Sequence, residues 1–136
     1  MMSWKGDVSR SKTILNIHAL LRQDLNDVLQ VLRDPQLIER RMAPLEQDLG
    51  TWLRAQNDQC YDELLGRHPE ASAMIEFLQT DRKAMQNRIM QLLEEVPAAY
   101  QNSKVRKFPR VFLEFSRRIS ERMAIEEDQL LPLLEK

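Results

Sequence analysis

Two charged residues near the end of the chain, Arg122 and Glu126, have the types and the spacing to form an ion pair inside the protein. They lie four residues apart in the stretch ERMAIEEDQLLPLLE, residues 121–135, so on a helix they share a face. That face borders the apolar stripe of the same segment. Either the two charges belong to a buried polar layer, or the long arginine stem lies on apolar surface while its charged head reaches water. Both interpretations fit the sequence.

Other polar residues occur at or beside apolar positions of further helical segments. They are His18, Gln56, Asn57 and Arg82. In an antiparallel bundle these side chains could share one layer with Arg122 and Glu126. Because burying an unpaired charge is costly, such a layer would need close pairing of its arginines with its carboxylates.

Inward-facing carboxylates and histidines often hold two metal ions in helix bundles. Here the chain has only two histidines, His18 and His68, and no His-x-x-x-Glu or Glu-x-x-His pair. Arginines at two seam positions would also repel a cation. We therefore predict no metal site and no cofactor. Since there is also no phosphate loop, nucleophile elbow or zinc spacing, we predict a non-catalytic protein, with Cys60 as a buried thiol.

Apolar residues recur at intervals of three and four along the chain, which predicts amphipathic helices. The first should begin near Ser9 or Ser11 and end at Asp34 and the proline after it. The same pair can begin the second helix, with Asp34 as its cap. We expect Pro44 to break or kink that helix, and the helix to stop near Gly66.

The third helix should begin at the His-Pro-Glu sequence of residues 68–70 and end at Pro97. A polar, basic linker follows, in which Lys104, Arg106, Lys107 and Arg110 could touch an acidic partner or simply be solvated. The last helix should begin near Phe108, with Pro132 kinking or terminating its final turns. Four such helices with short connections predict an all-α, up-and-down four-helix bundle, one domain over residues 1–136.

Bulk composition narrows the class of partner. The chain has 136 residues, with 43% hydrophobic and 30% charged, and a net charge of −1. This balance gives no general attraction to nucleic acid or to an anionic membrane. The sequence shows no signal-like or membrane-spanning run, and its single cysteine fits a reducing compartment. We expect a cytoplasmic protein, in which Trp4 folds back onto the bundle or contacts a partner.

The stretch LGTWLRAQNDQCYDELL, residues 49–65, resembles the second long helix of the Rsd/AlgQ family of bacterial anti-sigma regulators. The positions that keep the family's pattern are Leu49, Trp52, Leu53, Ala55, Tyr61, Asp62 and Leu64. Near the end of the chain Arg122, Glu126, Glu127 and Leu130 match the same family without gaps. Thr51 replaces the family's aspartate, and residues 56–58 replace its Gly-His-Phe.

This resemblance implies a transcription regulator that binds the promoter-recognition domain of the primary sigma factor and acts by covering it. A few aromatic and arginine anchors would give specificity. An acidic patch would face the basic DNA-reading helices of sigma. The candidate partner-binding residues are Arg22, Trp52, Tyr61, Arg82, Arg122, Glu126, Glu127 and Asp128.

A second resemblance is to hemerythrin-like bundles, whose last helix reads like H-x-x-x-E-E-x-x-L-F-P. The matching residues are Glu126, Glu127, Leu130 and Pro132. Arg122 stands where that family has a histidine. The other ligand positions are held by Leu25, Leu53, Asn57 and Arg82. This resemblance implies, as the alternative function, a metal-free hemerythrin-like bundle that binds a small ligand or another protein.

Overall fold

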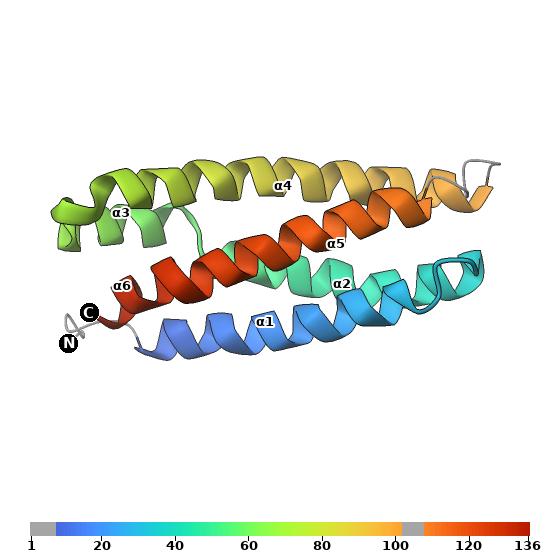
Figure 1. Cartoon of the computed structure of the whole chain (residues 1–136), viewed down its shortest axis with the longest axis horizontal. Coiled ribbons are helices and arrows are strands. Elements are labelled where there is room, and N and C mark those ends of the chain that lie inside the picture. Colours follow the sequence, from blue (N-terminus) through green and yellow to red (C-terminus); the bar gives the residue numbers. More distant parts are fainter. Residues whose placement is uncertain (1–7, 102–107) are drawn as a thin grey trace.

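Four long helices run alternately up and down the molecule (Figure 1). The computed structural model describes residues 8–101 and 108–136, and within these the side chains of residues 9–94 and 108–136. The long helices are α1 (Val8–Leu29), α2 (Pro35–Ala55), α4 (Ser72–Gln101) and α5 (Phe108–Ile125). Shorter elements are α3 (Asp58–Arg67), the 3-10 turn η1 (Pro69–Ala71), the π-helical turn η3 (Glu126–Leu130) and α6 (Leu131–Glu135). The predicted all-α, up-and-down four-helix bundle is confirmed, with no strand in the described part of the chain.

The helices form a square in which α1 packs against α2 and α5, and α4 packs against the same two helices. Two hydrophobic clusters fill the interior. The first joins all four long helices around Leu21, Leu49 and Phe112. The second joins the start of α1 to α3, α4 and α6 around Ile14 and Leu64. No helix among residues 8–101 and 108–136 combines the length and the apolar character needed to cross a membrane.

The predicted cap of the second helix is confirmed. The Asp34 side chain accepts the backbone N–H groups of Gln36 at 3.1 Å and Leu37 at 3.3 Å, two donors that the first turn of a helix leaves unbonded. The first helix begins at Val8, close to the predicted Ser9. It ends at Leu29, earlier than the predicted Asp34, and residues 30–33 form turns.

Three prolines lie within helical segments, and none of them ends its segment. The helix α2 continues through Pro44, and α4 continues past Pro97 to Gln101, so the prediction that Pro97 ends its helix is wrong. The C-terminal helix also passes Pro132, through η3 into α6. A proline in a helix interior removes one backbone hydrogen bond and crowds the preceding turn, at a cost of about 3 kcal/mol. The helices continue past these prolines in spite of that cost.

The real break in the second predicted helix falls at residues 56–57. There Asn57 accepts the N–H of Cys60 at 3.0 Å with its side-chain oxygen and begins α3. The chain thus leaves the helix where Gln56 turns into the interior, fully buried. Of the residues predicted to contact partners outside the helices, Trp4, Lys104, Arg106 and Lys107 lie outside the described residues. Arg110 is exposed on α5.

Candidate functional site

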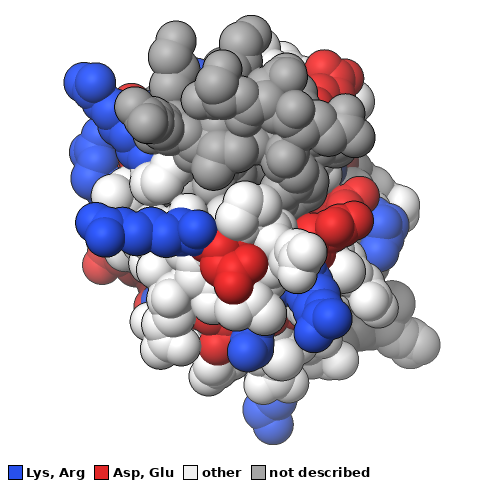
Figure 2. Space-filling view, turned by 90° about the vertical axis from the view of Figure 1, so that its right-hand side faces the viewer, with Lys and Arg blue, Asp and Glu red and all other residues white. Residues whose placement is uncertain are grey.

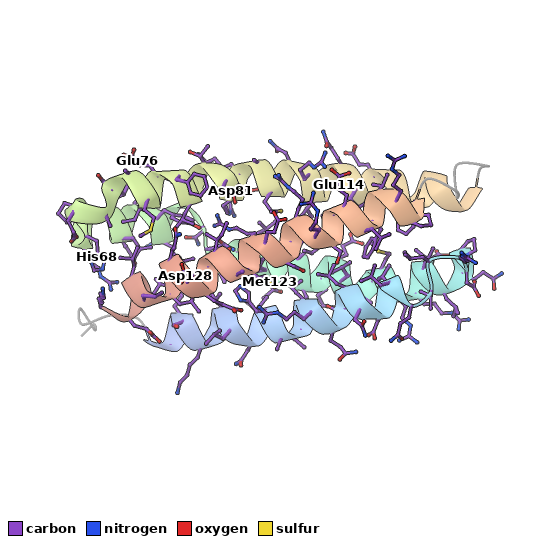
Figure 3. All side chains as sticks on the ribbon, viewed as in Figure 1. His68, Glu76, Asp81, Glu114, Met123 and Asp128 are labelled. Atoms are coloured by element: carbon purple, nitrogen blue, oxygen red, sulfur yellow. The ribbon has the colours of Figure 1, made fainter. Side chains whose placement is uncertain are left out.

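A buried arginine lies at the centre of the polar layer that separates the two hydrophobic clusters. The Arg122 side chain is 1% exposed, and all five of its N–H groups face an acceptor. The acceptors are Glu126 Oε2 at 2.7 Å, the Leu78 carbonyl oxygen and Asp81 Oδ2 at 3.0 Å each, Gln56 Oε1 at 2.8 Å and the Tyr61 hydroxyl oxygen at 2.6 Å. Asp81 lies on the side of α4 that faces α5 (Figure 3). Of the two interpretations that the sequence left open, the buried layer is confirmed for Arg122, Glu126, His18 and Gln56, and the one in which the arginine head reaches water is wrong. Asn57 was also expected in the layer but is exposed.

Glu126 balances the charge of this arginine and is fully buried. Its Oε1 accepts hydrogen bonds from Trp52 Nε1 and contacts His18 Nε2, both at 2.7 Å, while Oε2 accepts from Arg122. The three partners come from α1, α2 and α5. One carboxylate thus ties three helices together at one level of the bundle.

His18 meets a carboxylate with each of its ring nitrogens. Nε2 lies 2.7 Å from Glu126, and Nδ1 lies 2.7 Å from Oε2 of Glu127. A neutral imidazole has one N–H, so both contacts are hydrogen bonds only when the ring carries two protons. Glu127 in turn accepts from Arg22 at 2.6 Å. Burial alone would raise the pKa of Glu127, but the hydrogen bonds from Arg22 and His18 hold that pKa below its ordinary value.

These contacts form a chain of charges across the bundle. In order they are Arg22, Glu127, His18, Glu126, Arg122 and Asp81. Positive and negative groups alternate along it when His18 is protonated, so each charge lies between opposite neighbours. Arg22 is half exposed at one end, and Asp81 is a quarter exposed at the other. The layer is therefore an internal ion-pair network with both ends at the surface.

Tyr61 and Gln56 complete the layer on the side of α3. The Tyr61 hydroxyl donates to Gln56 Oε1 at 2.8 Å and accepts from Arg122. Burial raises the pKa of Tyr61 well above its ordinary value, which keeps the hydroxyl protonated and able to donate. The Gln56 side-chain nitrogen is buried without a partner.

The π-helical turn η3 presents both glutamates to the same histidine. Its wider turn is closed by the Leu131 N–H, which donates to the Glu126 carbonyl oxygen. Pro132 follows directly and has no N–H to continue the α-helical pattern. On a regular helix, consecutive side chains point about 100° apart. In η3 the side chains of Glu126 and Glu127 nevertheless reach the same ring, one at Nε2 and the other at Nδ1 of His18. Turns of this kind are frequent at functional sites.

The eight residues predicted to bind a partner divide by burial. Trp52, Tyr61, Arg122 and Glu126 are at most 1% exposed and have internal partners. Arg22 and Asp128 are exposed, and Arg82 and Glu127 are partly exposed. Since a partner of the folded bundle touches exposed atoms, only the last four can contact it directly.

Arg82 is not part of the layer. It donates to the Leu53 carbonyl oxygen at 2.8 Å and to Gln86 at 3.0 Å, so it serves one of the last carbonyl groups of α2. The acidic member of the layer on α4 is Asp81, which the sequence analysis missed. The position of Asp81, three residues after the buried Leu78, was the available signal, because residues three apart share a helix face.

A family model for the hemerythrin HHE cation-binding domain matches residues 10–134. The chain belongs to this family. No curated protein and no solved structure is significantly similar to it. The hemerythrin-like resemblance is therefore confirmed, whereas the resemblance to the Rsd/AlgQ family gains no support and stays a prediction.

The layer of this hemerythrin-family chain does not fit the cation that the family name implies. Both oxygens of Glu126 and both nitrogens of His18 already face protein groups. The guanidinium of Arg122 brings a fixed positive charge to the middle of the layer. Among the residues that the structure describes, no group of three or more His, Cys, Asp or Glu side chains could hold a metal ion.

A second polar contact joins Asp24 of α1 to Asp48 of α2. The sequence patterns did not indicate this pair. Asp24 is 8% exposed, and its Oδ2 is buried without a hydrogen-bond partner. Burial, followed by the hydrogen bond with Asp48 and the charges of Asp48 and Asp27, raises the pKa of Asp24 to about 7. The folded protein therefore holds the Asp24 proton more tightly than an exposed aspartate would.

We predict that Glu126→Leu destabilises the fold by about 3–5 kcal/mol, because it leaves Arg122 buried and unpaired. Glu121→Leu is the matched control, since Glu121 is 54% exposed in a surface ion pair and such pairs contribute at most about 1 kcal/mol. The double variant Arg122→Met with Glu126→Leu should recover most of the lost stability. Urea denaturation followed by circular dichroism measures all three. Equal losses for Glu126→Leu and Glu121→Leu would contradict the paired layer.

We also predict that Asp24→Asn stabilises the protein at alkaline pH. The ordinary carboxyl pKa is 3.8 and the folded value is about 7, so the folded state binds the proton more tightly. The contribution of Asp24 to stability is complete below pH 3.8 and is lost as the pH rises through about 7. Asparagine cannot ionise, so its advantage should reach a few kcal/mol at about pH 8 and shrink at about pH 5.

Chemical denaturation at both pH values measures this effect, with the exposed Asp62→Asn as the control. A stability difference for Asp24→Asn that is the same at both pH values would show that Asp24 does not titrate with folding.

Proposed function

We propose that this member of the hemerythrin HHE family is a non-catalytic bundle that binds another protein through its surface and does so without a metal. The observation that carries the proposal is the saturation of Arg122, whose five N–H groups all have acceptors inside the layer. A general base or a metal centre needs a group free to meet substrate. In this layer the histidine, the glutamates and the arginine all bond to one another.

The size of the recess next to the polar layer supports a protein partner over a small ligand held inside that layer. The recess next to the layer has a volume of about 60 Å³ and is lined by Asp81, Glu121 and Arg122 among others. Pockets for drug-sized ligands are typically about 300–1,000 Å³. A ligand of that size therefore has no room beside the polar layer.

A groove between α4 and α5 supports binding at the surface. It has a volume of about 210 Å³, and its lining combines the buried Leu92 and Phe115 with the 39% exposed Val111. The remaining lining residues are Arg88, Gln91 and Glu114. An apolar floor inside a polar rim is the composition of a protein interface core, and a groove of this volume suits one apolar anchor side chain of a partner.

Charge gives the partner no strong bias. The net charge is −1, and at the end of the bundle where α1 leads into α2 basic and acidic side chains are interspersed (Figure 2). The promoter-recognition domain of the primary sigma factor, implied by the Rsd/AlgQ resemblance, is the first candidate partner to test. The match to the hemerythrin family gives no support for binding to the sigma factor.

We expect Val111→Glu to abolish partner binding, because it places a charge over the apolar floor of the groove. Leu113→Glu is the matched control, since Leu113 is 54% exposed on the same helix and does not line the groove. Both surface changes should alter stability by no more than about 0.5 kcal/mol. Binding is measured by calorimetry with the purified sigma domain, and by quantitative capture from cell lysate with all three proteins as bait. Capture that is lost equally with both variants, or with neither, would contradict the proposed surface.

We expect protein purified from cells grown with added iron, zinc and manganese to hold far less than one metal ion per chain. Elemental analysis of the intact protein measures this content. A second sample, dialysed against buffer that contains the three metals, controls for metal lost during purification. Stoichiometric iron in the purified protein would contradict metal-independent function.

A further inference from the structure

We propose that Arg122 is the cation of this bundle: the polar layer is a receptor for a planar positive charge, and the chain itself supplies the guanidinium that fills it. The shell around this group consists of oxygen atoms only. Two are carboxylate oxygens, from Glu126 and Asp81, and three are neutral oxygens, from Gln56, Tyr61 and the Leu78 backbone. Such a set would suit a cation from any source.

The shell is held by parts of the protein other than α5, which carries Arg122. Tyr61 lies on α3, Leu78 and Asp81 lie on α4, and Glu126 lies in η3. Glu126 is further fixed by the Trp52 indole and by His18. Because these groups are positioned by separate elements, a free guanidinium that takes the place of the truncated arginine side chain should meet the same oxygen atoms.

The geometry selects a guanidinium over a metal ion. The nitrogen–oxygen distances from Arg122 are 2.6–3.0 Å, which are hydrogen-bond lengths. The oxygens approach Nε and both terminal nitrogens, so they lie around the edge of a planar group. Metal ligands instead converge on one point at about 2.0–2.6 Å. Lysine would place a point charge there and could not bridge these oxygens.

A small cation can reach this position from outside. The recess of about 60 Å³ between α4 and α5 is lined by Arg122 itself and by Asp81, which is a quarter exposed. Removal of the arginine side chain would extend this recess into the oxygen shell. The variant Arg122→Ala should therefore behave as an empty receptor.

The test is rescue of Arg122→Ala by free guanidinium or methylguanidinium. At millimolar concentrations, well below those that denature, either ion should raise the melting temperature of the variant in a saturable manner, as expected for a ligand that binds only the folded state. Urea, and sodium chloride at equal ionic strength, should not. Arg117→Ala is the matched control, because Arg117 lies on the same helix with its side chain 64% exposed, and it should show no such response.

Two further measurements keep the outcome decisive. If Arg122→Ala is unfolded, methylguanidinium should induce its folding, followed by circular dichroism. The double variant Arg122→Ala with Glu126→Gln removes one carboxylate of the shell and should lose the response. The proposal is overturned if neither ion stabilises or folds Arg122→Ala, or if zinc, manganese or ferrous iron does so better. Because these assays contain no partner protein, their failure is distinct from failure of the proposed surface binding.

Discussion

The ion pair between Arg122 and Glu126 is the contact on which the rest of the layer depends. Both side chains are almost completely buried between two hydrophobic clusters, where an unpaired charge would cost several kcal/mol. Each therefore requires the other, and each requires the neutral groups that satisfy its remaining hydrogen-bonding capacity. A shift of α1 by one helical turn, about 5.4 Å, would separate His18 from both glutamates. The layer thus specifies the alignment of helices that apolar packing alone would leave less well defined.

Alternation of charge explains how the bundle tolerates so many ionisable groups at one level. Arg22, His18 and Arg122 alternate with three carboxylates along the chain from Arg22 to Asp81. Because the two ends of this network are partly exposed, water solvates them and lowers the cost of burying the rest. The same argument accounts for the lowered pKa of Glu127, which lies between two donors. By contrast, burial and the neighbouring carboxylates of Asp48 and Asp27 raise the pKa of Asp24.

Membership in the hemerythrin HHE family is compatible with the lack of a fitting donor set among the described residues, because a fold determines where a site lies but not what occupies it. The bundle keeps a polar level between its hydrophobic clusters. In this chain that level is made of hydrogen bonds between side chains, with a guanidinium at its centre. The proposed binding of another protein therefore falls to the surface, where the α4–α5 groove is lined by both apolar and polar residues.

The sequence by itself determined the helices, the Asp34 cap and the candidates for a polar layer, since each depends on residues that are close along the chain. Apolar periodicity and capping depend on neighbouring residues. The sequence of one helix is likewise enough to show that Arg122 and Glu126 lie beside its apolar stripe. Only the tertiary structure decided which polar groups meet, because Asp81, Glu127 and His18 come from three different elements. It also decided that the helices pass Pro97 and Pro132 and break at residues 56–57. Those choices depend on packing and on the demands of buried charge, which act between segments distant in sequence.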